Sequence, residues 1–321
     1  MKKFFFPLAM LLALGVAMVP AGDRVHADDF IDLDLTNVAP ATRGIFRRAE
    51  QFWESRIQGY SDSLPANIRS QLTGRLQITA ETIAIDGVGG ILGQAGPDTI
   101  AQSAVTIGNP ADGRVHFTTV PLTGTMSFDI FDAGRADFES TVFHEMAHVL
   151  GFGTLWTLNG INDGANNQGL LQARPGGFQY VGRNALLGFR SESGHHRANY
   201  VPTENGGGAG TALGHWAGGT SPNWFFAPAN GSRAELMTGF ATGAPSFVSE
   251  ATWGAMADVG WAVEGINPND GSFTNSTFGT SPFPKSYRGA AFNQFSAVPE
   301  PSSIAFIGLG MLGLIARRKR A

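Results

Sequence analysis

Residues 144–148, HEMAH, combine residue types and a spacing that suit metal-dependent hydrolysis. On an α-helix, residues four apart lie on the same face, so His144 and His148 direct two imidazoles to one point. Histidines spaced this way are zinc ligands in metallohydrolases, and the glutamate after the first bonds a water on the metal. The motif predicts a zinc site with Glu145 as catalytic base; the alternative is a surface helix that carries two histidines by chance.

The residues around the motif predict the helix that it needs. Asp137 is a candidate N-cap, and Gly151 and Gly153 are expected to end the helix. Apolar residues recur with the period of a buried helical face at Phe138, Val142, Met146, Val149 and Leu150. The pattern thus predicts one amphipathic helix that ends in a glycine turn.

A catalytic zinc ion generally takes three protein ligands and leaves one position open, so the helix supplies one ligand too few. In the common extension of the motif, a histidine follows three residues after the glycine at Gly151, but Thr154 stands there. A hydroxyl is a poor substitute for imidazole, so the third ligand must lie further along the chain. The histidine candidates are His195, His196 and His215, and a different class of zinc peptidase would use a glutamate such as Glu192 or Glu204.

The chain before the motif predicts a sheet. Residues 75–86 alternate apolar and polar side chains as in a half-buried strand, and residues 113–122 and 124–132 are two further strand candidates that lead into the motif helix. His116 lies in the first of these two and is interpreted as structural. Residues 87–97 are a glycine-rich turn region without the lysine of a phosphate-binding loop, which excludes nucleotide binding.

A further helix with an apolar face is expected over residues 42–58, ended by Gly59. A sheet followed by one helix that carries the metal motif predicts an α+β fold, with a cleft between the sheet edge and the helix. After the helix, residues 153–214 are a long insertion rich in glycine, asparagine and aspartate. Its cluster at residues 159–169 is a candidate calcium site through oxygen ligands, although it does not match a twelve-residue calcium loop.

The composition limits the class of protein. The chain has 321 residues, of which 43% are hydrophobic, which is enough for one sizeable domain or two lobes with a shared core. The formal net charge of -4 gives no reason to expect a nucleic-acid partner. The absence of cysteine excludes disulfides, thiolate zinc ligands and a thiol that could hold a precursor inactive.

The N-terminus predicts export. Lys2 and Lys3 precede an apolar run over residues 4–19, and the small residues near Ala27 suit cleavage there, so residues 1–27 are interpreted as a signal peptide. Cleavage after Ala21 and an uncleaved membrane anchor are the alternatives. The apolar run is short for a span and is interrupted by Pro20, which favours a signal peptide.

The C-terminus predicts sorting. Residues 298–301, VPEP, are followed by an apolar run over residues 304–316 and by the basic residues 317–320, RRKR. Residues 298–321 together resemble a PEP-CTERM sorting signal. The resemblance implies a bacterial protein that is held transiently in the inner membrane, cut by a sorting or processing protease, and released or displayed at the cell surface or in the extracellular matrix. The alternative is a permanent C-terminal anchor, and residues 264–297 are predicted to be a flexible spacer.

Several segments together resemble the leishmanolysin family of metzincin zinc peptidases. They are HEMAHVLGF at residues 144–152, GHW at 214–216 after a long insertion, ELMTG at 235–239, FRRAEQFWESRI at 46–57, GGILGQAGP at 89–97 and VSEATWGAMADVGW at 248–261. The resemblance implies that one catalytic Zn²⁺ is bound by His144, His148 and His215. It further implies that Glu145 is the catalytic base and that Met237 forms the turn beneath the metal.

The same resemblance implies a metzincin-like fold, with a twisted mixed sheet and the active-site helix in an N-terminal lobe, a loop-rich C-terminal lobe and a cleft between them. Residues 28–263 would form the catalytic domain of a secreted or cell-surface zinc endopeptidase that acts on proteins or peptides. Typical members are rich in disulfides and carry a pro-segment cysteine that blocks the zinc, and this chain has neither. The alternative function is a catalytically silent surface or matrix protein that retains the fold.

Overall fold

The computed structural model describes residues 30–72, 74–108, 113–162, 167–208, 210–218, 234–241, 246–266 and 296–297. The predicted signal peptide and the predicted sorting tail lie outside these residues, as does most of the predicted spacer. Within the described ranges, none of the helices combines the length and the apolar character needed to cross a membrane.

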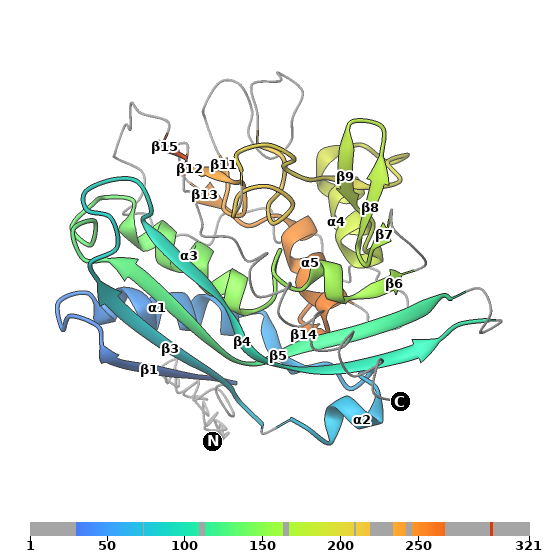
Figure 1. The fold of residues 1–321 in the computed structure, drawn as a ribbon, viewed down its shortest axis with the longest axis horizontal. Coiled ribbons are helices and arrows are strands. Elements are labelled where there is room, and N and C mark those ends of the chain that lie inside the picture. Colours follow the sequence, from blue (N-terminus) through green and yellow to red (C-terminus); the bar gives the residue numbers. More distant parts are fainter. Residues whose placement is uncertain are drawn as a thin grey trace, which may run out of the picture.

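A five-stranded mixed sheet forms the base of the structure (Figure 1). Its strands run in the order β1 (Ile31–Asn37), β3 (Leu76–Ile83), β5 (Val115–Asp129) and β4 (Gly93–Thr106), and β6 (Gly160–Asn162) also pairs with β5. β1, β3 and β5 are mutually parallel, whereas β4 is antiparallel to β5 and occupies the edge. The predicted α+β fold with a mixed sheet is therefore confirmed.

Two predictions for the sheet are wrong. Residues 113–122 and 124–132 were expected as two strands, but the single strand β5 covers most of both. Pro121 stays in this strand and pairs with Ile100 of β4, next to a register irregularity, and pairing with β3 begins only at Thr123. A proline is tolerated there because one side of the strand needs no backbone donor. The glycine-rich turn was also expected to reach residue 97, yet β4 begins at Gly93.

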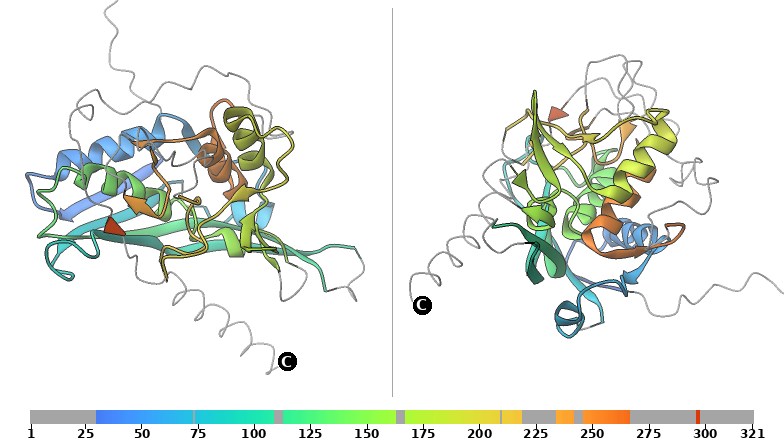
Figure 2. Two further views of the ribbon diagram at one scale, coloured as in Figure 1. Left: turned by 90° about the horizontal axis from the view of Figure 1, so that it is seen from above. Right: turned by 90° about the vertical axis from the view of Figure 1, so that its right-hand side faces the viewer.

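Helices α1 (Arg43–Glu54) and α3 (Phe138–Val149) lie on one face of the sheet (Figures 1 and 2). The indole Nε1 of Trp53 on α1 donates to the carbonyl of Phe143 on α3 at 3.1 Å, which fixes the two helices against each other. The expected helix over residues 42–58 is four residues too long at its C-terminal end. The chain leaves the helix to form β2 (Ile57–Tyr60), which pairs with β14 (Trp261–Val263) far along the sequence.

The two ends of α3 differ in how their free backbone amides and carbonyls are bonded. Asp137 is the N-cap residue, as predicted, but its side chain makes no capping bond, because Arg135 holds the carboxylate at 2.8 and 2.9 Å. At the other end, Gly151 has a φ of 100°. The amides of Gly151 and Phe152 donate to the carbonyls of His148 and Ala147 at 3.1 and 3.0 Å, the bonding pattern of a Schellman turn. This turn reverses the chain directly after the second motif histidine.

The second half of the chain is more regular than its glycine-rich sequence indicates. The predicted insertion contains the 3₁₀ helix η2 (Trp156–Leu158), helix α4 (Arg183–Ser193) and a small sheet of β10 (Val201–Pro202), β9 (Gly177–Tyr180), β8 (Leu171–Arg174) and β7 (Asn167–Gln168). The remaining elements are α2 (Ala66–Arg69), α5 (Glu250–Val259) and the short strand pairs β11 (Ala234–Glu235) with β13 (Ser246–Phe247) and β12 (Phe240–Ala241) with β15 (Ser296–Ala297).

Helix α5 connects the two halves. Its Trp253 packs against Phe52 and Trp53 of α1, with ring centroids 5.7 and 5.1 Å apart. On another side, the partly buried Asp258 accepts hydrogen bonds from the amides of Asn184 and Ala185 at the start of α4, at 2.9 and 3.1 Å. A carboxylate at a helix N-terminus satisfies amides that have no partner within the helix. Burial raises the pKa of Asp258 from 3.8 to about 6.

The raised pKa of Asp258 predicts how stability depends on pH. Because the folded protein binds this proton more tightly, the stability from Asp258 is fully present below pH 3.8 and is lost as the pH rises through about 6. A shift of this size corresponds to about 3 kcal/mol. The Asp258→Asn variant lacks the ionisation, so its free energy of unfolding should fall less over that pH range than that of the wild type.

Urea denaturation at stepped pH measures this difference. The Tyr180→Phe variant is the control, because it removes the hydroxyl that donates to Asp258 at 3.1 Å but keeps the ionisable carboxyl. Because that bond lowers the pKa of Asp258, the free energy of unfolding of this variant should fall with pH at least as steeply as that of the wild type. Parallel curves for the wild type and Asp258→Asn would contradict the assignment.

Candidate metal centre

Three histidines from two distant segments meet in the interior. The Nε2 atom of His144 lies 3.0 Å from that of His148 and 3.0 Å from that of His215, and the last two are 3.1 Å apart. His144 is 8% exposed and the other two are 1% exposed. The described residues contain no other group of three or more potential metal ligands of the histidine, cysteine and carboxylate types.

In each of the three histidines, the hydrogen bond made by Nδ1 determines whether Nε2 carries a proton. Each Nδ1 atom lies 2.8 to 2.9 Å from a backbone carbonyl, which can only accept a hydrogen bond. Each neutral ring therefore carries its proton on Nδ1 and presents a bare lone pair on Nε2. The carbonyls belong to Leu236 for His144, Phe152 for His148 and Thr211 for His215.

Three converging lone pairs repel one another unless a cation lies between them. A tetrahedral ion with Zn–N bonds of about 2.0–2.1 Å holds its nitrogen ligands about 3.3 Å apart. The observed separations of 3.0 to 3.1 Å are close to that value. The buried three-histidine group therefore fits a metal ion such as zinc.

The other candidates for the third ligand lie elsewhere. His195 and His196 are exposed after the end of α4, and the ring of His195 stacks on Phe189 with centroids 5.7 Å apart. The hydroxyl of Thr154 donates to the carbonyl of His148 at 2.7 Å, which gives it a structural contact at the end of the helix. His116, which was interpreted as structural rather than as a ligand, is exposed on β5 and does not belong to the three-histidine group.

The two glutamate alternatives are also separate from the histidines. The carboxylate of Glu192 on α4 accepts the amide of Glu250 at 2.8 Å, at the start of α5. The carboxylate of Glu204 accepts the nearby amide of Gly206 at 2.8 Å. The structure thus brings His215, and none of the other sequence candidates, to the helix pair.

His215 reaches α3 through a close approach of two backbones. Gly153 has a φ of 73°, and a side chain there would collide with Gly214, the residue before His215. Trp216, the residue after His215, is fully buried, and its ring lies 5.1 Å from that of Phe152. Glycine on one side and an aromatic contact on the other therefore hold the third histidine against the turn that follows α3.

The predicted methionine turn lies beside the histidines. Met237 is fully buried, and its carbonyl accepts the amide of Trp216 at 2.9 Å. The preceding carbonyl, that of Leu236, is the partner of His144 Nδ1. The turn comprising residues 235–238 thus contacts the histidine segments from both α3 and the 214–216 region.

Sequence reasoning missed Glu235, the first residue of this turn. It is buried, and burial raises its pKa to about 7 despite hydrogen bonds from several donors that oppose the rise. A glutamate side chain is ordinarily on the surface, so its burial could not be inferred from the segment ELMTG alone. The three carbonyls that orient the histidines were missed as well, because backbone groups leave no signal in the sequence.

Glu145 follows His144 on α3 and is fully buried. Its side chain lies against β4, where a Cβ atom built on Gly93 would be 3.0 Å from Glu145 Cγ and 2.9 Å from the ring of Phe128. The absence of a side chain at Gly93 therefore leaves room for Glu145 between the helix and the edge strand.

The candidate calcium cluster is only partly described. The side chain of Asn159 makes hydrogen bonds within the fold. Its Nδ2 donates to the carbonyls of Thr119 and Leu155, and its Oδ1 accepts the amide of Thr119, at 2.8 to 3.1 Å. Residues 163–166 lie outside the described ranges. Calcium binding there stays a prediction.

Comparison with known families identifies one segment. Residues 297–320 match the PEP-CTERM protein-sorting motif, which indicates an exported protein that exosortase processes at this C-terminal signal and sorts to the cell surface. A comparison with curated proteins gives no significant match for the chain. The histidine pair on α3 fits a metzincin-like arrangement, and the three-histidine group is consistent with a metal site.

The geometry predicts which histidines control metal content. His215→Ala should lower zinc affinity at least about tenfold, because one of three ligands is lost. The double variant His195→Ala/His196→Ala is the control and should bind zinc like the wild type. Elemental analysis after dialysis, with a chelator competition titration, measures both, and the reverse ranking would show that the third ligand is wrongly assigned.

Proposed function

We propose that the protein is an exported zinc-dependent endopeptidase, a leishmanolysin-like metzincin in which His144, His148 and His215 hold the metal and Glu145 is the general base. The observation that carries the proposal is the convergence of three Nε2 atoms within 3.1 Å of one another. Two of them belong to α3, the helix that also carries Glu145. A structural metal site would not need the glutamate between the two helix histidines.

The mechanism follows from the types of residue at the site. A zinc ion held by three imidazoles supplies Lewis acidity, which activates water and offsets negative charge on the substrate carbonyl. Glu145 takes the proton of the attacking water and delivers it to the leaving amine. The carbonyl partners of the three Nδ1 atoms keep the rings in one orientation and in the tautomer that leaves Nε2 available.

The edge strand supports a peptide substrate. No strand of the described residues pairs with the outer side of β4, whose residue Gly93 lies against Glu145. An extended peptide can add to such an edge through main-chain hydrogen bonds, with its scissile bond near the general base. We therefore assign the substrate cleft to the space between an N-terminal lobe with this sheet and α3 and a C-terminal lobe with His215.

The N- and C-terminal segments support an extracellular location for the proposed enzyme. The sorting motif at residues 297–320 indicates processing by exosortase and display at the cell surface. We further propose that residues 1–27 are removed as a signal peptide, that residues 28–263 form the catalytic domain, and that the tail is anchored transiently in the inner membrane. The substrates would then be proteins or peptides outside the cell.

The direct test is hydrolysis of casein by the purified, zinc-loaded protein. The expected activity is abolished by the zinc chelator phenanthroline and restored by zinc. If the protein binds zinc but hydrolyses neither casein nor a panel of peptides, it is instead a catalytically silent surface or matrix protein that retains the fold.

Glu145→Gln should keep the zinc and lose activity by roughly 10²- to 10⁴-fold, because the amide cannot accept the proton of the attacking water. Glu139→Gln on the same helix is the control. Glu139 pairs with Arg48 at 2.6 Å at the other end of α3, so its loss should leave activity and zinc content unchanged. Undiminished hydrolysis by Glu145→Gln, measured with a fluorogenic peptide, would remove Glu145 from the mechanism.

Gly93→Ala tests the space beside Glu145. The added methyl group would crowd Glu145 Cγ and the ring of Phe128, so the base should shift and kcat should fall at least about tenfold while zinc content stays the same. Gly134→Ala is the control, because nothing lies within 4 Å of a Cβ atom there. Equal kcat values for the two variants would exclude this contact from positioning the base.

A further inference from the structure

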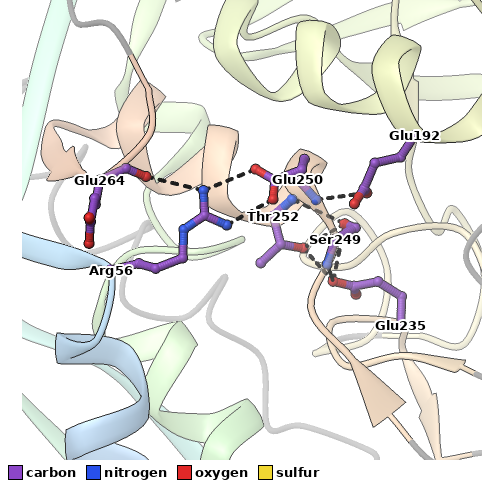
Figure 3. A network of polar contacts seen from close by, with 7 residues as sticks. All are labelled: Arg56, Glu192, Glu235, Ser249, Glu250, Thr252 and Glu264. Atoms are coloured by element: carbon purple, nitrogen blue, oxygen red, sulfur yellow. Dashed lines mark hydrogen bonds and ion pairs between the residues drawn. The ribbon is translucent and has the colours of Figure 1, made fainter. Parts of the chain in front are cut away.

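A network of polar side chains surrounds the N-terminus of α5 (Figure 3). Arg56 pairs with Glu250 at 2.9 and 3.0 Å, and Glu192 accepts the amide of Glu250. Ser249 is the N-cap, and its hydroxyl accepts the amide of Thr252 at 3.2 Å. The buried carboxylate of Glu235 belongs to the same network, because it accepts the amide of Ser249, but it reaches this helix from the methionine turn.

Both oxygens of Glu235 accept hydrogen bonds. Oε2 accepts the amide of Met237, within its own turn. Oε1 accepts the amide and hydroxyl of Ser249 at 3.2 and 3.3 Å and the hydroxyl of Thr252. The carboxylate therefore joins the methionine turn to the start of α5.

Each side of this connection leads to a different histidine. On the turn side, the carbonyl of Leu236 is the acceptor for His144 Nδ1 at 2.8 Å. On the helix side, Thr252 Oγ1 accepts the indole Nε1–H of Trp216 at 2.8 Å, and Trp216 adjoins His215 in the chain. Glu235 thus lies between the segments that orient two of the three rings.

We propose that Glu235 is a positioning residue of the metal centre: its carboxylate orders the turn of residues 235–238 and Thr252, and so holds the Leu236 carbonyl against His144 and the Trp216 indole beside His215. The inference rests on the metal site of the proposed function and extends it to metal affinity. Partners that orient a ligating histidine typically change metal affinity about 10- to 100-fold when they are lost.

A carboxylate suits this position better than an amide of the same shape. Hydroxyl groups can turn to accept as well as donate, but the amides of Met237 and Ser249 can only donate. In Glu235→Gln, the NH₂ group must face one of those two amides. The oxygen is expected to stay with the three donors at Ser249 and Thr252, so the clash falls on Met237 and displaces the Leu236 carbonyl.

The test compares Glu235→Gln with Glu192→Gln in the purified protein. Glu192 lies on α4 and accepts an amide at the same helix end, and the oxygen of a glutamine can still accept there. Competition with a chromogenic chelator should show zinc affinity reduced about 10- to 100-fold in Glu235→Gln and unchanged in Glu192→Gln. The visible absorption of the Co²⁺-loaded protein should change only in Glu235→Gln, because the ligand geometry is altered.

The thermal midpoint of the metal-free protein separates positioning from plain stability. If Glu235→Gln lowers this midpoint but leaves zinc affinity and the Co²⁺ spectrum as in the wild type, Glu235 only stabilises the fold and the proposal is overturned. If Glu235→Gln does not fold, Thr252→Val and Thr252→Ser decide. Valine removes the hydroxyl between Glu235 and Trp216 and should weaken zinc binding, serine should restore it, and equal affinities would overturn the proposal.

The wild type distinguishes this inference from the proposed function. A wild-type protein that binds no zinc overturns both. Zinc binding without peptidase activity overturns the proposed function alone, and the Glu235 result then still decides the positioning role. Peptidase activity with equal zinc affinity in all variants overturns only the inference.

Discussion

Three imidazole lone pairs directed at one buried point are the constraint on which the rest of the structure depends. Their Nε2 atoms lie 3.0 to 3.1 Å apart, and the three Nδ1 protons are already bonded to carbonyls. No arrangement of protons on neutral rings relieves that crowding, whereas one divalent cation does. The burial of the group adds to the effect, because electrostatic repulsion is less screened away from water.

Two layers of contacts keep the rings in place against that repulsion. The sheet and α1 hold α3, since Trp53 bonds the backbone of Phe143 beside the first histidine. Helix α5 holds the other side, where Trp253 packs on Trp53 and Thr252 bonds Trp216. The same two tryptophan-bearing helices therefore link both histidine segments, so the metal centre and the apolar core depend on each other.

The wrong predictions for the bounds of β4 and β5 have a common cause. Glycine and proline at residues 87–97 and 121–124 are local signals for turns, and pairing partners far along the chain overrode them. β4 and β5 gain a long antiparallel ladder by running through these positions, which outweighs the local preference. The helix over residues 42–58 was overextended for a similar reason, because residues 57–60 pair with β14, about two hundred positions away.

The sequence by itself determined the helix pair of His144 and His148, with Glu145 between them, because a four-residue spacing on a helix sets their relative direction whatever surrounds it. It also determined the sorting tail, which is a linear signal. Among His195, His196 and His215, a family resemblance implied His215. The tertiary structure decided the choice, because it depends on the approach of Gly214 to Gly153. It likewise decided the burial of Glu235 and the carbonyl partners of the rings, because contacts between distant segments leave no trace in local spacing.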